Sequence, residues 1–252
     1  MSLRNEYLAL IPAYNEAATV ADVIRAVHAK APYCDALVVN DGSTDETAAR
    51  ARAVGASVLE LPFNLGIGGA VQAGFVYARE NGYRFMVQID ADGQHDPDAV
   101  VKLIDAMAAN PAVDVVCGSR FLVAGEYLAP VSRRTGIHLF AFLLSRIVGQ
   151  RVTDPTSGFR LYNRRAIELF AADYPHDYPE VEAVLMLHNH RLRMIEVPVR
   201  MFARGGGRSS ISSGKSVYYM IKVLLAIFVG LLRRRAVPRP GEPAPVAADH
   251  GI

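Results

Sequence analysis

Short apolar runs that alternate with helical patterns are the feature of this sequence that most restricts its fold. Five runs are typical of buried strands and fall at residues 7–12, 36–40, 57–61, 85–89 and 113–117. Helical patterns lie between them at 17–30, 43–54, 68–81 and 96–109; Ser43 with Glu46 suits a capping box, and Asp96 with Pro97 suits a helix start. This order predicts an α/β fold with a mostly parallel sheet and helices on both faces.

The pattern weakens after Arg120. We expect helices at 133–148, 179–190 and 214–234 and a strand at 194–201. The last residues, 236–252, are rich in Pro and Ala, which predicts a disordered tail. The predicted organisation is a catalytic domain over 1–212, an amphipathic helix over 213–235 and the tail.

Composition excludes several classes of protein. The 252 residues are 51% hydrophobic, which suits one large domain, and the formal net charge of +2 gives no basis for nucleic-acid binding. Cys34 and Cys117 form no C-x-x-C pair, so the sequence predicts neither a disulfide framework nor a zinc site. The first residues lack an apolar signal region, and a cytoplasmic protein is the default expectation.

An acidic motif follows the fourth predicted strand. Asp90 and Asp92 are two residues apart, so in an extended chain their carboxylates point the same way and repel unless a cation lies between them. Hard oxygen ligands suit Mg²⁺ or Mn²⁺, and Gln94 or His95 can complete the shell. The alternative is a solvated turn, since Asp and Gly are common in turns.

Polar residues also follow the first two predicted strands. Because ligands bind outside the carboxyl ends of parallel strands, Asp41 is a candidate for ribose or base contacts and Tyr14 for stacking on a base. The same segment can simply turn the chain and cap the next helix. The glycines of residues 64–69 suit either ligand approach or close packing of a helix on the sheet.

Four segments in this order resemble a known family: Pro12-Ala13-Tyr14-Asn15-Glu16, Asp41-Gly42-Ser43-Thr44-Asp45, Gln88-Ile89-Asp90-Ala91-Asp92-Gly93-Gln94-His95-Asp96-Pro97 and Asp154-Pro155-Thr156-Ser157-Gly158-Phe159-Arg160. Together they resemble family 2 glycosyltransferases of the GT-A fold, a Rossmann-like nucleotide-diphospho-sugar transferase fold. The likeness is strongest to dolichyl-phosphate mannose synthases and bacterial polyprenyl-phosphate glycosyltransferases, and it covers about residues 7 to 230.

The resemblance implies an inverting, metal-dependent transfer of a hexose from GDP-mannose or a UDP-sugar, with a lipid phosphate as acceptor. It places four residues around the nucleotide, namely Pro12, Tyr14, Glu16 and Asp41. It makes Asp90, Asp92 and Gln94 the metal environment, with Asp90, Ala91 and Asp92 beside the donor. It places Arg120 and Arg204 near donor or acceptor phosphates.

The acceptor decides which further residues act. An ionised phosphate needs cations to hold it, and the candidates are Arg133, Arg134, Arg204 and Arg208. A sugar hydroxyl needs a base, for which Asp154 and Glu182 are candidates; each can instead be structural, Asp154 in a turn and Glu182 on an exposed helix face. The metal at Asp92, with help from Arg204, would neutralise the leaving diphosphate.

The C-terminal apolar segment bears on the acceptor. Residues 217–232 are apolar apart from Lys222, but sixteen residues fall short of the ~20 that span a bilayer. They suit an interfacial helix on a membrane surface, or a helix packed on the domain or in a homo-oligomer. Two other functions stay open: a soluble transferase acting on a sugar or glycan hydroxyl, and a non-catalytic nucleotide-sugar-binding subunit.

Overall fold

The computed structural model describes residues 6–122, 131–176 and 178–202, without the side chains of residues 131–135. Within these residues one seven-stranded sheet has the order β3-β2-β1-β4-β6-β5-β7. Its strands are β1 (Tyr7–Ala13), β2 (Cys34–Asn40), β3 (Ser57–Glu60), β4 (Phe85–Gln88), β5 (Val115–Ser119), β6 (Arg160–Asn163) and β7 (Met194–Pro198). Only β6 runs antiparallel to its neighbours β4 and β5 among these strands; every other pairing is parallel.

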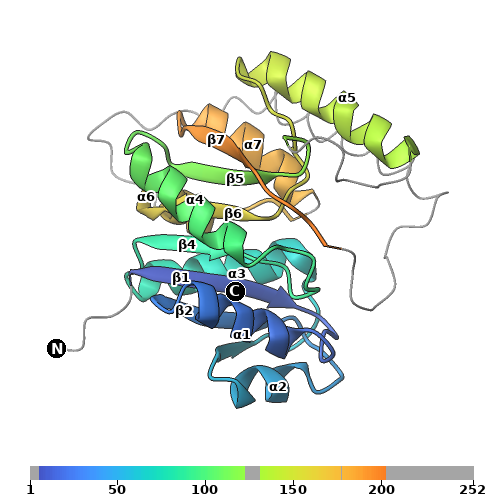
Figure 1. The fold of residues 1–252 in the computed structure, drawn as a ribbon, viewed down its shortest axis with the longest axis vertical. Coiled ribbons are helices and arrows are strands. Elements are labelled where there is room, and N and C mark those ends of the chain that lie inside the picture. Colours follow the sequence, from blue (N-terminus) through green and yellow to red (C-terminus); the bar gives the residue numbers. More distant parts are fainter. Residues whose placement is uncertain (1–5, 123–130, 177, 203–252) are drawn as a thin grey trace, which may run out of the picture.

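Helices cover both faces of the sheet (Figure 1). One face packs against α1 (Val20–Lys30), α2 (Thr47–Ala53) and α4 (Asp98–Ala109). The other packs against α3 (Gly66–Glu80), α5 (Val131–Val148), α6 (Arg164–Ala172) and α7 (Pro179–Asn189). The prediction of a mostly parallel α/β sheet covered on both faces is therefore confirmed.

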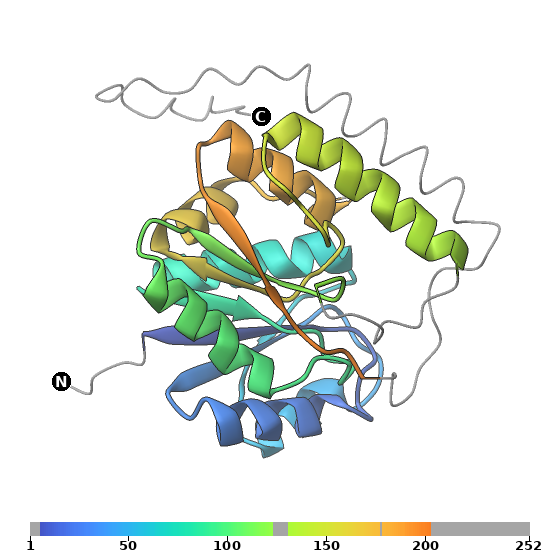
Figure 2. The ribbon, with the colours of Figure 1, turned by 45° about the horizontal axis from the view of Figure 1, so that its top comes forward.

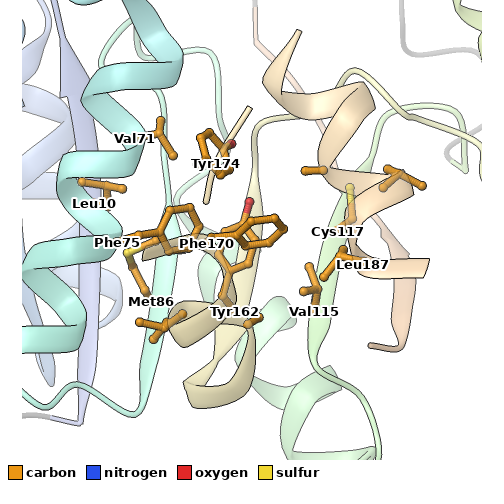
Figure 3. Packing of buried hydrophobic residues seen from close by; sticks show 14 of the residues in the cluster. Leu10, Val71, Phe75, Met86, Val115, Cys117, Tyr162, Phe170, Tyr174 and Leu187 are labelled. Atoms are coloured by element: carbon orange, nitrogen blue, oxygen red, sulfur yellow. The ribbon is translucent and has the colours of Figure 1, made fainter. Parts of the chain in front are cut away.

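The two cores follow from the two-residue period of a strand. In β1, Leu8 and Leu10 enter the core under α3, whereas Ala9 and Ile11 enter the core under α1 and α4. All four are at most 1% exposed, because a central parallel strand is buried on both faces. Figure 3 shows the first core, where the rings of Phe75, Tyr162, Phe170 and Tyr174 meet at centroid distances of 4.9 to 5.7 Å.

Two glycines of α3 allow the helix to lie close to its neighbours. A Cβ on Gly74 would lie 2.3 Å from the Leu10 side chain, and one on Gly68 would lie 2.7 Å from backbone atoms of Pro175 and His176. Of the two roles predicted for the glycines of residues 64–69, close packing accounts for Gly68, although its neighbour is the 175–176 backbone and not the sheet.

One sequence expectation was wrong, and two elements of the fold were not predicted. The capping box does not form: α2 begins at Thr47, and the Ser43 hydroxyl accepts the Asn15 N–H, 28 residues away. The strand β6 and the helix α6 are not predicted from the sequence; β6 has only four residues, three of them buried, which is too short a run to show a strand period.

Several predictions fall outside the described residues: Arg204, Arg208, the helix over 213–235 and the tail over 236–252. Arg133 and Arg134 lie in α5, but their side chains are not described. In the described part of the chain, every helix is too short or too polar to cross a bilayer.

Candidate functional site

The polar motifs meet at one edge of the sheet. The carboxyl ends of β1, β2, β4 and β5 lie there, and so does the amino end of the antiparallel β6 (Figures 1 and 2). The segment 154–160 therefore reaches this edge through Arg160, the first residue of β6. The topology thus brings the strand-end motifs together as predicted. The strand β6, which was not predicted, adds the segment 154–160 to this edge.

The loops after β1 and β2 are joined by hydrogen bonds. Asn15 has a φ of 56°, a left-handed conformation that Asn tolerates better than most residues. Its N–H donates to Ser43 Oγ at 2.9 Å, and its Oδ1 accepts the Thr44 N–H at 2.9 Å. Beside this junction Pro12 is buried, Glu16 is half-buried and Tyr14 is 49% exposed, so Tyr14 has a ring face available to a ligand.

Asp41 holds the start of α3. Its side chain is almost fully buried, Oδ1 accepts the Leu65 N–H at 2.7 Å and Oδ2 accepts the Gly66 N–H at 2.9 Å. A helix start leaves N–H groups without partners in the helix, and this carboxylate satisfies two N–H groups there. Each carboxylate oxygen accepts more than one hydrogen bond, so nucleotide binding by Asp41 stays a prediction beside this structural role.

The acidic motif forms a tight turn between β4 and α4. Gly93 has a φ of 73°, which lets the Gln94 N–H donate back to Asp92 Oδ1 at 3.0 Å. Asp92 is buried, as is Ala91, whereas the Asp90 side chain is 39% exposed. His95 is buried against the ring of Phe159, and its Nε2 lies 3.1 Å from Asp90 Oδ2. The imidazole thus orients Asp90.

The donor atoms of this motif fit a hard cation. Gly158 lies beside the Asp90 carboxylate, since a Cβ there would be in ordinary van der Waals contact with Asp90 Oδ1 at 3.5 Å. In the described residues, no three His, Cys, Asp or Glu side chains gather as a ready metal cluster. Mg²⁺ is commonly held by one or two carboxylates together with substrate phosphates, so Asp90 and Asp92 match a metal that the substrate helps to bind.

A cavity of about 350 Å³ lies between α1 and α4, next to the acidic motif. Asp90 and Asp92 belong to its lining, but most of its surface is apolar and comes from residues such as Val23, Val100 and Phe159. It therefore differs in chemistry from the polar loops that follow β1 and β2.

A buried ion pair lies at the end of β5. The Arg120 guanidinium donates through Nε to Asp154 Oδ2 and through Nη2 to Asp154 Oδ1, both at 2.6 Å. The Arg120 N–H binds the same carboxylate, and Nη2 also donates to Thr156 Oγ1 at 2.7 Å. The Asp154 side chain is 0% exposed and the Arg120 side chain 8%. Asp154, predicted as a candidate base, is placed here as the anchor of Arg120.

Two further residues of this region carry chemistry that sequence reasoning missed. Burial raises the pKa of the Glu180 carboxyl; the negative charge of Asp90 also raises it, and Arg160 and Arg120 lower it. Arg160 is buried and donates through Nη2 to the carbonyls of Pro155 and Glu180 at 3.3 and 2.8 Å. Glu180 is thus within electrostatic range of both the acidic motif and Arg120, whereas the predicted base Glu182 is half-buried and lies two residues further along α7.

Comparison with known proteins decides the family. Residues 9–170 match the model of "Glycosyl transferase family 2". The chain belongs to glycosyl transferase family 2. The chain is 31% identical over 226 residues to a polyprenol monophosphomannose synthase of Mycolicibacterium smegmatis, covering 86% of this chain and 84% of that one. It is 33% identical over 216 residues to an undecaprenyl-phosphate mannosyltransferase of Micrococcus luteus, covering 82% and 88%.

The fold of this family 2 glycosyltransferase is similar to that of solved structures. Glucosyl-3-phosphoglycerate synthase from Mycobacterium tuberculosis, in complex with Mn²⁺, UDP-glucose and phosphoglyceric acid, superposes with a TM-score of 0.65 at 22% identity. The match covers 87% of this chain and 78% of that one. The predicted GT-A fold and the resemblance to the polyprenyl-phosphate branch of the family are both confirmed.

Proposed function

We propose that this family 2 glycosyltransferase moves a hexose from a nucleoside-diphosphate sugar to a polyprenyl or dolichyl phosphate, with a divalent metal. The observation that carries the proposal is that two features of opposite charge lie at the same edge of the sheet. An acidic motif, Asp90 and Asp92, suits a metal-bound diphosphate, and a buried arginine, Arg120, suits a second phosphate. The names of the relatives, which act on polyprenol and undecaprenyl phosphates, support the same acceptor class.

On the donor side, Asp90, Asp92 and Gln94 would hold Mg²⁺ or Mn²⁺. The metal, when bound, supplies positive charge that stabilises the departing diphosphate. Pro12, Tyr14, Glu16 and Asp41 form the nucleotide side, where the exposed ring of Tyr14 can stack on the base. Because α3 is held by Asp41, the same carboxylate would couple nucleotide binding to the position of that helix.

On the acceptor side, the burial of Asp154 favours a phosphate over a hydroxyl. A phosphate monoester with a second pKa of about 6 is largely ionised at pH 7 and needs no base to attack the sugar. Arg120 is held rigidly by Asp154 and Thr156 and would fix one phosphate oxygen. Arg133, Arg134, Arg204 and Arg208 remain candidates for further phosphate contacts.

Exposed residues of α5 suggest that this part of the protein contacts a membrane. Leu139 and Phe142 are exposed large apolar side chains on this helix, and the Arg146 guanidinium lies 5.2 Å from the centre of the Phe142 ring. Apolar side chains flanked by a cation suit the boundary of a membrane that contains anionic lipids. Together with the predicted helix over 213–235, α5 would bring the site to the lipid carrying the phosphate.

One observation favours a second function, transfer to a sugar or glycan hydroxyl. Burial and the negative charge of Asp90 raise the pKa of Glu180 above its ordinary value, and a raised pKa makes a carboxylate a better proton acceptor. In that reaction Glu180, and neither Asp154 nor Glu182, would be the base. A Glu180→Gln enzyme would then lose transfer, whereas with a phosphate acceptor it would keep most of it.

The direct test measures sugar transfer to undecaprenyl phosphate in detergent micelles. Wild-type protein with Mn²⁺ is offered radiolabelled GDP-mannose, UDP-glucose or UDP-N-acetylglucosamine, and label is counted in the organic extract. Asp92→Ala is expected to abolish transfer. The matched control is Asp96→Ala, which removes a nearby carboxylate that accepts the Asp98 N–H, and this variant is expected to keep transfer. Metal-dependent transfer by the Asp92→Ala protein would rule out the metal assignment. In a parallel reaction with a glycan acceptor, label in the glycan together with none in undecaprenyl phosphate would select the second function.

A further inference from the structure

We infer that Glu196, a residue of β7 outside every motif of the sequence, positions Arg120 for the acceptor phosphate. This inference rests on the proposed function. Glu196 holds the backbone of residues 153 and 154, and the Asp154 carboxylate in turn holds Arg120. Glu196 is therefore a positioning residue, and its effect should appear in how the acceptor is bound.

The Glu196 carboxylate makes four hydrogen-bond contacts with three donor groups of residues 153 and 154. Oε1 accepts the N–H groups of Thr153 and Asp154 at 3.0 and 2.9 Å. Oε2 accepts the Thr153 N–H at 2.8 Å and the Thr153 hydroxyl at 2.7 Å. Such contacts between N–H groups and a carboxylate are stronger than those between neutral groups.

This anchoring matters because residues 151–159 belong to no helix or strand. A ladder of backbone hydrogen bonds cannot fix their position, and Pro155 has no N–H to contribute. Because Glu196 holds the backbone at residue 154, it also fixes the position of the Asp154 side chain. Arg120 in turn takes its orientation from both oxygens of Asp154.

The position of Glu196 in the sheet makes the support rigid. Glu196 pairs in register with Cys117 of β5, and Arg120 follows directly after the last residue of that strand. The Thr153 hydroxyl lies 2.6 Å from Ser119 Oγ, which gives a second connection between the held segment and the end of β5. Both sides of the Arg120–Asp154 pair are thus fixed to neighbouring strands of one sheet.

The test compares Glu196→Gln with Asp114→Asn in the full chain. Asp114 is a matched control, since its carboxylate also holds backbone, accepting the Arg193 N–H at 2.8 Å, but it precedes β5 at the opposite end of that strand from Arg120. Both changes replace a carboxylate by an amide of the same shape. Initial rates are measured with undecaprenyl phosphate and the donor that the wild type uses, varying each in turn, and thermal unfolding is recorded for both variants.

We expect Glu196→Gln to raise the KM for undecaprenyl phosphate about tenfold and to leave the donor KM within about twofold, since small misplacements of a binding group reduce productive binding steeply. Asp114→Asn should lower the unfolding temperature and change neither KM. Thr153→Val keeps the backbone contacts and removes only the hydroxyl, so it should raise the acceptor KM by a smaller factor. This variant replaces Glu196→Gln in the test if Glu196→Gln does not fold.

An unchanged acceptor KM in Glu196→Gln, or an equal rise in Asp114→Asn, would overturn the inference while leaving the proposed function intact. If Glu196→Gln does not fold, an unchanged acceptor KM in Thr153→Val overturns it. Failure of the wild type to glycosylate undecaprenyl phosphate with any donor would instead overturn the proposed function, and this inference with it.

Discussion

Replacing Asp154 by Asn tests whether the buried ion pair is the structural centre of the acceptor side. Asn keeps the shape of the side chain, so no cavity is created, but it leaves the Arg120 charge buried without a carboxylate. Removing one partner of a buried pair costs about 3–5 kcal/mol. Because three groups of Arg120 donate to this one carboxylate, we expect a loss of at least about 3 kcal/mol in the free energy of unfolding.

The assay is urea denaturation followed by circular dichroism. The free energy of unfolding falls with urea concentration by about 2 kcal/mol per M, so the expected loss lowers the urea midpoint by about 1.5 M. Asp22→Asn is the matched control: its partner is Arg25, both side chains are more than 60% exposed, and a surface pair contributes at most about 1 kcal/mol.

A double variant separates stability from binding. Replacing a buried pair by apolar residues of similar size is often neutral for stability, so Arg120→Leu with Asp154→Leu should recover much of the lost midpoint. It should nevertheless fail to bind the acceptor phosphate, because the guanidinium is gone. A midpoint of Asp154→Asn equal to that of the wild type would refute the reasoning, as would a double variant that loses the sum of the two single losses.

Two further predictions concern packing and protonation. Gly68→Ala should destabilise the fold by about 1–3 kcal/mol, because its Cβ would lie 2.7 Å from the backbone of residues 175 and 176; an unchanged urea midpoint would contradict this. The pKa of Glu180 is raised above its ordinary 4.5, so the folded state binds the proton more tightly than the unfolded state. The stability that this proton gives is present below about pH 4.5 and is lost as pH rises through the folded pKa. The urea midpoint of Glu180→Gln should therefore rise relative to wild type as pH increases through that window, and a constant difference from pH 4 to 8 would count against it.

The sequence by itself determined the fold class and the edge of the sheet where the site lies. Alternating strands and helices require parallel pairing, and parallel strands place their carboxyl ends together. Motifs that follow separate strands, such as those at Asp41 and Asp90, must then meet. The order of the motifs also identified the family, which the comparisons confirmed.

The tertiary structure alone decided which side chains are bound to one another. Arg120 and Asp154 are 34 residues apart, and Glu196 reaches residues 153 and 154 from β7, which lies at the far edge of the sheet. No local period encodes such contacts, because they depend on the insertion of the antiparallel β6 between β4 and β5. For the same reason Asp154 could be predicted as a base from its sequence position, while its complete burial beside Arg120 became visible only in the folded chain.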